Sequence, residues 1–423
     1  MKYLIFLLFA FSITSFSQTW QKTSIKSNIN GQRYDDVYFL DENIGWAANG
    51  YYASVYKTID GGKTWVDQLN ESTLGSNYYF RNIEFLNSDI GFLGTLNNKF
   101  FKTIDGGETW NPVTNISPYP FAICGLCTVG SSTVYGCGAY FTPAYIIKST
   151  DSGTTWNYID MSTYANALVE IYFLDENIGF VSGRNDNGGT ILKTTDGGLT
   201  WTEIFNSNIV GEYVWKLQIL EANNDVIFGS IESVSPNLGK LIKSTDAGLT
   251  WNSYNAPETN IQAVGFLDEN RGWMGGHTTG FYETLNGGLT WTNLNIGGNL
   301  NRIFFINNSL AYASGTSIYK FTTETLSANT DLNLKGSSLK ISMKTNPVKS
   351  FLEFNILFEK ADNILIELYN INGKFIKQLS RESIQTSNTE KEYSIFVGDL
   401  ASGTYFVNFH NNYMRESLKF IKE

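Results

Sequence analysis

Two carboxylates, Asp36 and Glu170, could together perform acid–base chemistry in this chain of 423 residues. Glycoside hydrolysis needs one carboxyl group to protonate the leaving oxygen and a second to act as nucleophile or base across a cleft. In the repeat architecture that the sequence predicts, both side chains lie near the mouth of a central channel. A carbohydrate-active hydrolase that uses Asp36 and Glu170 is therefore one interpretation of the sequence.

Several other side chains at the same mouth could bind a ligand without reacting with it. Arg81 offers a forked donor for carboxylate, sulfate or carbonyl groups. Trp215 offers a flat surface for a sugar ring or an apolar side chain, and burying it could make it a binding hot spot. The predicted ligand-binding residues are Arg81, Tyr213, Trp215, Lys216, Gln262 and Arg302.

Composition argues against several other kinds of site. The chain has only two histidines, His277 and His410, one in each predicted domain, so neither a serine or cysteine triad nor a zinc site is expected. We expect no metal and no cofactor. The net charge of -10 argues against nucleic-acid binding, which needs basic patches. The three cysteines, Cys124, Cys127 and Cys137, leave open either a disulfide that includes Cys137 or buried thiols.

A repeated segment of nine residues determines the architecture that must hold these side chains. It occurs six times, with Asp or Asn at its fourth position and Trp at its ninth: Asp60 and Trp65, Asp105 and Trp110, Asp151 and Trp156, Asp196 and Trp201, Asp246 and Trp251, Asn286 and Trp291. A motif present in every repeat is typical of a structural role. Asn286 keeps an acceptor and loses the charge, which argues against a metal site in the motif.

The spacing of these tryptophans predicts a ring of four-stranded units. Successive tryptophans from Trp65 to Trp291 are 45, 46, 45, 50 and 40 residues apart, the length of one propeller blade. Trp20 lies 45 residues before Trp65, and no such motif follows the last incomplete unit after Trp291. We therefore expect the strand around Trp20 to complete that unit and close a ring of seven blades.

The nine-residue segment resembles the Asp-box, or bacterial neuraminidase repeat. Its Gly-Gly pair permits a tight turn with positive φ, and its Asp accepts hydrogen bonds from backbone N–H groups or the Thr hydroxyl. Evenly spaced Asp boxes in one ring most resemble photosystem II stability and assembly-factor-like proteins. A sialidase would need three arginines around a carboxylate, and its N-terminal Phe-Arg-Ile-Pro motif is absent, so that activity is not expected.

The order of strands in a propeller blade predicts which face carries a site. The Asp-box turns and the Phe-Leu-Asp hairpins, such as Phe39–Trp46, follow odd-numbered strands and share one face. We expect ligands on the opposite face, where Asp35 and the candidate side chains lie. Loop aromatics are expected nearby: Tyr51, Tyr52, Tyr78, Tyr79, Tyr119, Tyr140, Phe141, Tyr164 and Tyr213. An alternative is that these aromatics only pack between blades.

Both ends of the chain predict export. Residues 1–17 resemble a secretory signal peptide, with Lys2 before an apolar run and cleavage expected before Gln18. Residues 18–325 form the predicted propeller, and the polar stretch 326–338 is a predicted linker. Residues 339–423 resemble the type A sorting domain of the Bacteroidota type IX secretion system, on the motifs Asn346–Ile356, Ile366–Phe375 and Asp399–Phe409.

The predicted fold is therefore all-β, a seven-bladed β-propeller followed by a small antiparallel β-sandwich. The sorting-domain resemblance implies passage through the periplasm, contact with the type IX machinery, and a secreted or outer-membrane surface location. We expect a monomeric, non-enzymatic propeller that binds a protein or polysaccharide. The alternative is the hydrolase with Asp36 and Glu170.

Overall fold

The computed structural model divides the chain into two compact units, Met1–Ala328 and Asn329–Glu423. It describes residues 18–141, 143–323, 339–358, 362–370, 375–384, 389–410 and 415–423. The predicted signal peptide and linker, and part of the predicted motif Ile366–Phe375, lie outside these residues. No helix in the described part of the chain is long and apolar enough to span a membrane.

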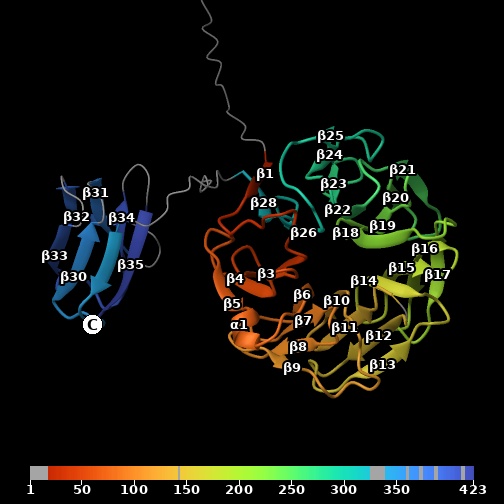
Figure 1. The fold of residues 1–423 in the computed structure, drawn as a ribbon, viewed down its shortest axis with the longest axis horizontal. Coiled ribbons are helices and arrows are strands. Elements are labelled where there is room, and N and C mark those ends of the chain that lie inside the picture. The colour runs from red at the N-terminus through yellow and green to blue at the C-terminus, as the bar shows by residue number, and fades with distance from the viewer. Residues whose placement is uncertain are drawn as a thin grey trace, which may run out of the picture. The chain divides into compact units, whose positions relative to one another are not determined.

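Unit 1 holds seven four-stranded sheets among its described residues, and Figure 1 shows them arranged in a ring. The first sheet contains β2 (Asp36–Phe39), β3 (Gly45–Asn49), β4 (Ser54–Thr58) and β5 (Val66–Leu69). The second contains β6 (Phe80–Phe85), β7 (Gly91–Thr95), β8 (Phe100–Thr103) and β9 (Asn111–Pro112). The third contains β10 (Gly125–Val129), β11 (Thr133–Gly138), β12 (Tyr145–Ser149) and β13 (Asn157–Asp160). The fourth sheet contains β14 (Ala167–Phe173), β15 (Gly179–Asn185), β16 (Gly188–Thr194) and β17 (Thr202–Asn206). The fifth contains β18 (Tyr213–Leu220), β19 (Asn223–Glu232), β20 (Lys240–Ser244) and β21 (Asn252–Asn255). The sixth contains β22 (Ile261–Phe266), β23 (Gly272–Gly276), β24 (Tyr282–Thr284) and β25 (Thr292–Asn293).

The seventh sheet joins the two ends of the ring. Its strands are β26 (Arg302–Asn307), β27 (Leu310–Ser314), β28 (Ile318–Thr322) and the N-terminal β1 (Thr19–Lys22). β1 pairs antiparallel with β28, and Trp20 lies opposite Phe321. Trp20 is buried and stacks on Phe281 with ring centroids 4.3 Å apart. The N-terminal strand therefore completes the last sheet, as the Trp20–Trp65 spacing predicts.

The Asp-box turns contain the hydrogen bonds that the sequence predicts, together with one that it does not. Asp60 accepts from the Thr64 N–H at 2.8 Å and from the Thr64 hydroxyl at 2.6 Å. The Thr58 hydroxyl donates to Asp60 at 2.9 Å and accepts from the Gly62 N–H at 2.9 Å. Gly62 has a φ of 83°, a backbone conformation that favours glycine. The Thr or Ser two residues before the Asp is therefore also part of the turn.

Asn286 reproduces this turn without a charge. Its side-chain oxygen accepts from the Thr290 N–H at 2.9 Å, as the aspartates do. Its amide nitrogen then donates to the Thr290 hydroxyl at 2.8 Å, whereas an aspartate would accept from that hydroxyl. A threonine hydroxyl can both donate and accept, so the turn tolerates either residue.

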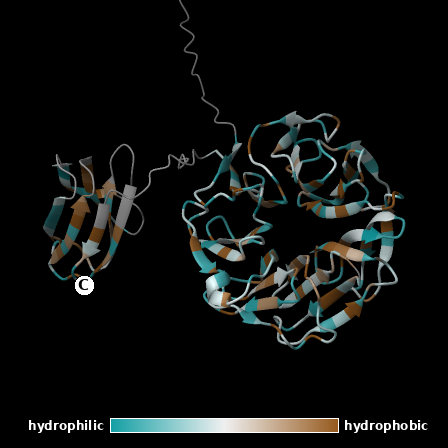
Figure 2. Cartoon of the chain, viewed as in Figure 1, coloured by the Kyte–Doolittle hydropathy of each residue, from teal (hydrophilic) through white to brown (hydrophobic). Residues whose placement is uncertain are grey.

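The core of unit 1 lies between neighbouring sheets, where large aromatic side chains pack. Trp46 stacks on Phe85 with ring centroids 3.5 Å apart, and Tyr135 stacks on Phe173 at 3.7 Å. Figure 2 shows hydrophobic residues along the strands, interrupted by hydrophilic ones. The three cysteines are buried free thiols, and burial raises the pKa of each. The structure therefore has thiols where a disulfide was one of the two expectations.

A short helix, α1 (Glu71–Leu74), follows β5 and is absent from the sequence-based expectations. Asn70 caps it by accepting from the Thr73 N–H, and the Thr73 hydroxyl accepts from the Asn70 N–H. Gly75 ends it with a φ of 67°. One helical turn carries too few residues for a helical period, so only the capping pattern could have indicated it.

Unit 2 is a sandwich of two antiparallel sheets. One contains β29 (Leu339–Met343), β30 (Phe351–Phe358) and β33 (Thr389–Phe396); the other contains β31 (Asp362–Asn370), β32 (Phe375–Ile384), β34 (Gly403–His410) and β35 (Arg415–Lys422). In β30 buried and partly exposed side chains alternate strictly, and Phe354 packs edge-on against Phe409 of the other sheet at 5.5 Å. The two sheets thus enclose one apolar core. The all-β fold class is confirmed in both units.

Candidate functional site

A pocket of about 240 Å³ lies in unit 1 on the face opposite the Asp-box turns, and we call it the mouth pocket. Its lining residues all belong to the ends of strands or to loops at that edge of the sheets: Arg33, Asp35, Tyr79, Arg81, Leu96, Tyr140, Trp215, Glu232, Gln262 and His277. Three predicted ligand-binding residues, Arg81, Trp215 and Gln262, are among them. These three come from different sheets, so the ring brings together residues far apart in the sequence.

Three β-bulges turn these side chains toward the pocket. The pairing of β6 with β7 skips Arg81, that of β18 with β19 skips Trp215, and that of β22 with β23 skips Gln262. A bulge inserts one extra residue into a strand and re-aims its side chain. Each bulge lies at the start of an innermost strand, where the mouth pocket begins. The same irregularity therefore supplies three of the pocket's polar or aromatic walls.

Asp35 organises the cationic side of the pocket. Its Oδ1 accepts from Arg33 Nε, from Arg81 Nη1 and from the Tyr79 hydroxyl, each at 3.3 Å. Its Oδ2 accepts from the Gly50 N–H at 3.2 Å. Because the single Asp35 carboxylate pairs with the guanidinium groups of Arg33 and Arg81, these three side chains together carry a net positive charge.

Arg81 remains charged although it is only 4% exposed. Burial alone would lower the pKa of Arg81, but the neighbouring Asp35 carboxylate raises it above its usual value. Its guanidinium carbon lies 5.5 Å from the centroid of the Trp215 ring. Its Nη2 has no hydrogen-bond partner within the described residues. Arg81 thus has a buried donor without a partner among the described residues, and hydrogen bonds from a charged donor are stronger than neutral ones.

Burial also shifts the pKa values of two other groups that line the pocket, His277 and Glu232. Burial, with Arg33 and Arg81 nearby, lowers the pKa of His277 to about 4, so its imidazole is neutral. Burial also raises the pKa of Glu232, which accepts from Gln262 Nε2 at 3.3 Å. The partnerless Nη2 of Arg81 suits a ligand group that accepts hydrogen bonds, such as a carboxylate, sulfate or carbonyl.

Trp215 and Tyr213 differ from the expectation of an exposed aromatic surface. They are 5% and 8% exposed, and their rings stack with centroids 5.2 Å apart. Tyr140 stacks on Trp215 at 5.8 Å, and the Arg184 guanidinium lies 4.4 Å from the Tyr213 ring centroid. These neighbours cover the rings because aromatic stacking removes apolar surface from water. Only a small part of Trp215 is left to line the pocket.

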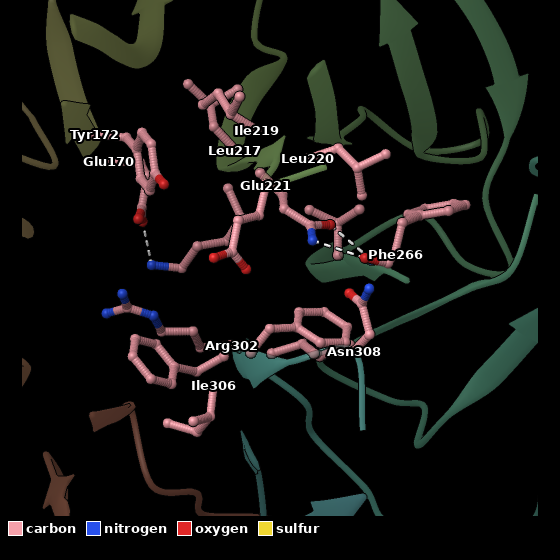
Figure 3. A pocket seen from close by; sticks show the side chains of 16 residues that line it. Glu170, Tyr172, Leu217, Ile219, Leu220, Glu221, Phe266, Arg302, Ile306 and Asn308 are labelled. Atoms are coloured by element: carbon pink, nitrogen blue, oxygen red, sulfur yellow. Dashed lines mark hydrogen bonds and ion pairs between the residues drawn. The ribbon is translucent and has the colours of Figure 1, made fainter. Parts of the chain in front are cut away.

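A larger cavity of about 360 Å³ lies deeper among the innermost strands, and we call it the channel cavity. Three predicted site residues, Glu170, Lys216 and Arg302, line it, and it reaches Glu221 and Asn308 beside hairpins on the Asp-box face. Figure 3 shows Glu170 and Arg302 at one end and Phe266 and Asn308 at the other. The larger cavity thus extends toward the face on which no ligand was expected.

The two candidate catalytic carboxylates are both occupied by cations. Asp36 accepts from Arg302 Nη1 at 2.9 and 3.0 Å, and also from the backbone N–H groups of Val37 and Ile83. Glu170 pairs with Lys216. Asp36 is 1% exposed and lines neither pocket. Glu170 therefore lines the channel cavity, whereas Asp36 is held by its hydrogen bonds and lines neither pocket.

Glu84 is a third carboxylate near these pairs that sequence reasoning missed. Burial raises its pKa to about 8, and it accepts from the Thr128 N–H at 3.3 Å and from the Thr128 hydroxyl at 3.2 Å. Its signal in the sequence is an acidic residue between the apolar Ile83 and Phe85 of an innermost strand. It lines neither pocket, so we assign it no part in binding. The described residues contain no cluster of three or more His, Cys, Asp or Glu side chains suited to a metal ion.

Family models match two segments of the chain. Residues 345–423 match the secretion system C-terminal sorting domain, and residues 9–95 match the photosynthesis system II assembly factor YCF48. The first match confirms the predicted sorting domain and indicates export to the cell surface or the medium. A search of curated proteins found no match.

Solved structures share the fold at low sequence identity. YCF48 from Cyanidioschyzon merolae is 18% identical with a TM-score of 0.57, over 72% of this chain and 99% of that chain. PorZ, an essential surface component of the type-IX secretion system of Porphyromonas gingivalis, is 13% identical with a TM-score of 0.53, over 95% of this chain and 61% of that chain. The GH74 enzyme of Niastella koreensis is 12% identical with a TM-score of 0.53, over 94% of this chain and 73% of that chain. The chain is thus an exported all-β protein, in which a ring with the fold of the YCF48 and PorZ propellers precedes a secretion-system sorting domain.

Proposed function

We propose that this exported propeller is a non-enzymatic binding protein, and that its mouth pocket takes an acceptor group of a protein or polysaccharide outside the cell. The acceptor is a carboxylate, sulfate or carbonyl oxygen, which the fork of Arg81 can bind. The observation that carries this proposal is the set of three bulges that bring Arg81, Trp215 and Gln262 to one pocket.

Two further observations support binding at this place. Gln262 and Arg81 line the pocket, and each has one buried side-chain atom, Oε1 and Nη2, without a partner among the described residues. Buried polar atoms without partners are costly, and a ligand that satisfies them regains that free energy. One solved relative, 16% identical over 72% of this chain, is described as YCF48 bound to D1 peptide. A peptide is therefore one ligand class to test.

A carbohydrate-active hydrolase is the second candidate, and the channel cavity is its possible site. GH74 enzymes share the fold, and Glu170 lines a cavity of about 360 Å³. Glu170, however, is paired with Lys216, and Asp36 is held by four hydrogen bonds outside the cavity. Two carboxylates that act on a glycosidic bond must both face it. The contacts therefore favour the binding protein.

The proposal is tested by a pull-down from surface proteins and by a glycan array. Both use residues 18–423, which we call the mature chain. Once a ligand is identified, Arg81→Ala should weaken it at least tenfold, about 1.4 kcal/mol. Arg81→Lys keeps the charge but loses the fork, and it should weaken binding of a carboxylate or sulfate less than the alanine does. Arg271→Ala serves as control, because Arg271 pairs with Glu283 and follows a hairpin on the Asp-box face.

Thermal melting of each variant must show a folded ring before its affinity is compared. Full affinity of folded Arg81→Ala would place the ligand away from the mouth pocket. Release of reducing sugars from a polysaccharide, abolished by Glu170→Gln, would instead establish the hydrolase.

A further inference from the structure

A third pocket lies at the outer part of the first sheet of unit 1, and we call it the rim pocket. Its volume is about 240 Å³, and it shares no lining residue with the mouth pocket or the channel cavity. Its walls come from the segment between β1 and β2, from β3, β4 and the loop between them, from β5, and from Asn70 before α1. The helix α1 and the long segment after β1 are departures from the regular repeat. The rim pocket therefore belongs to this one sheet.

Asparagine side chains form a fixed polar wall in the rim pocket. Asn49, which is 2% exposed, donates from Nδ2 to Asn28 Oδ1 at 2.8 Å. Its own Oδ1 accepts from the Tyr52 N–H at 3.3 Å. Both Nδ2 and Oδ1 of Asn49 are thus hydrogen-bonded. The bond from Asn49 orients the Asn28 side chain, whose own Nδ2 takes no part in it.

Two buried polar atoms beside this wall lack partners among the described residues. They are Asn28 Nδ2 and the hydroxyl of Ser54, a residue that is 4% exposed. Ser54 lies directly opposite Asn49 in the pairing of β3 with β4, so their side chains lie on the same face of the sheet, and Asn28 bonds to Asn49. A buried hydroxyl or amide without a hydrogen bond costs about 1–3 kcal/mol. A ligand that presents a hydroxyl here could accept from the amide and bond to the serine.

The remaining walls are aromatic, and the charges balance. Tyr34 and Tyr56 contact each other edge-on with centroids 6.0 Å apart, and Tyr52 stands at the rim with 39% of its surface exposed. The charged lining residues are one lysine, Lys26, and one aspartate, Asp67. With no excess charge, the pocket has no preference for an anion or a cation. Tyrosine rings, amides and a serine hydroxyl suit a ring that is apolar on its faces and carries hydroxyls on its edge.

We propose that the rim pocket binds one neutral sugar residue of a glycan chain. Asn28 and Ser54 would bond to its hydroxyls, and Tyr52 would pack against its ring. This site is separate from the mouth pocket, so it gives the propeller a second point of attachment. Two linked sites raise the overall affinity for a long polymer without any new contact at either one.

The test uses the full mature chain and free neutral sugars as probes. Saturation-transfer NMR and calorimetry are carried out with glucose, galactose, mannose, xylose and N-acetylglucosamine, each as the monosaccharide and as a linear oligomer. Glucuronate is the charged probe. At least one neutral sugar should bind, and in Arg81→Ala, which removes the carboxylate donor of the mouth pocket, glucuronate should bind no better than glucose. Tyr52→Ala and Ser54→Val should each weaken that sugar at least fivefold.

Two matched variants separate this site from the mouth pocket. Tyr164→Ala removes a tyrosine of nearly equal exposure, 38%, which lines none of the three pockets described here, and it should leave the affinity unchanged. Arg81→Ala should also leave it unchanged. If Arg81→Ala weakens the sugar and Tyr52→Ala does not, the sugar binds at the mouth and the rim-pocket proposal is wrong. Absence of binding by every neutral sugar would overturn it as well, and neither result decides whether the mouth binds a protein.

Discussion

The aspartates of the repeated turns act as hydrogen-bond acceptors that hold the turn, and we assign them no part in catalysis or metal binding. Asp105 accepts from the Thr109 N–H at 2.9 Å, from the Thr109 hydroxyl at 2.6 Å and from the Thr103 hydroxyl at 2.7 Å. It lies at the surface, so these bonds compete with water. Asn286 makes equivalent contacts, so the turn needs an acceptor and not a charge.

We predict that Asp105→Ala lowers the free energy of unfolding by about 1 kcal/mol, the usual cost of losing a capping acceptor. Asp105→Asn should cost less, because Asn286 shows that an asparagine fits. Urea denaturation of the full chain measures both. Calcium-dependent stability that disappears with Asp105→Ala would show a metal role and contradict this account.

The same turns predict a loss of stability in acid. Hydrogen bonds from threonine, serine and backbone groups lower the pKa of Asp151, Asp196 and Asp246 to about 2, below their ordinary 3.8. The unfolded chain therefore binds protons at a higher pH than the folded chain does. The stabilisation is present above about pH 4 and is lost as pH falls through 2.

A variant with Asn at Asp151, Asp196 and Asp246 isolates this effect. Its melting temperature should fall less between pH 4 and pH 2 than that of the unchanged chain. An identical fall in both proteins would assign the acid sensitivity to other carboxyl groups.

The sequence predicted the types of the mouth residues better than their exposure. Arg81 and Gln262 line the pocket, but Trp215 is nearly covered. Lys216, one residue beyond the bulge, lines the channel cavity instead. Bulges depend on pairing between strands, and the sequence pattern of a single strand does not show them.

At the scale of the strands and turns, neighbouring sheets are joined by the first lysine of the repeated segment. Lys57 donates to the Gly106 carbonyl at 2.9 Å, and Lys148 donates to the Gly197 carbonyl at 2.8 Å. In each case the carbonyl belongs to the Asp-box turn of the next sheet. The repeat was recognised as a turn, but these contacts make it a link between sheets as well.

We predict that Lys57→Met lowers the free energy of unfolding by about 1 kcal/mol, because the Gly106 carbonyl loses a charged donor. Lys102→Met is the matched control, since Lys102 holds the same place in the next turn and shows no such bond within the described residues. Denaturation by urea compares the two. Equal losses would mean that the lysine stems stabilise the ring and the hydrogen bond does not.

The N-terminal strand supports a second prediction about these elements. Deleting Gln18–Ile25 removes β1 and exposes the edge of β28 that pairs with it. It also leaves a cavity where the buried Trp20 side chain packs. Loss of a buried tryptophan alone costs about 3–5 kcal/mol, so the melting temperature should fall sharply. Unchanged melting of the deletion variant would refute closure of the ring by this strand.

The tryptophan spacing was sufficient to predict the strand order and the split sheet, because each repeat must bury its aromatic side chains against the next. It did not predict α1, whose four residues replace a regular connection, or that the long segment after β1 lines the rim pocket together with Asn70, the N-cap of α1. Local departures from a repeat are weak signals in sequence, although in this chain one of them builds a pocket.

For the whole molecule, the sorting domain defines where the propeller acts. Residues 345–423 match the sorting-domain family, and unit 2 has its own apolar core. We predict that a chain ending at residue 325 stays in the periplasm as a folded propeller. Immunoblots of periplasmic, surface and medium fractions test this prediction, with the full chain as control. Surface display of the shortened chain would place the export signal elsewhere.

Hydrogen exchange of the mature chain, with and without the partner isolated from the cell surface, tests the central claim of a ligand site at the mouth. We predict slower exchange in residues 31–36, 78–82, 213–217 and 261–263, which surround the mouth pocket. The Asp-box turns should exchange at the same rate in both states. Protection confined to the Asp-box turns, or to the hairpins that border the channel cavity, would contradict a binding site formed by Arg81 and Gln262.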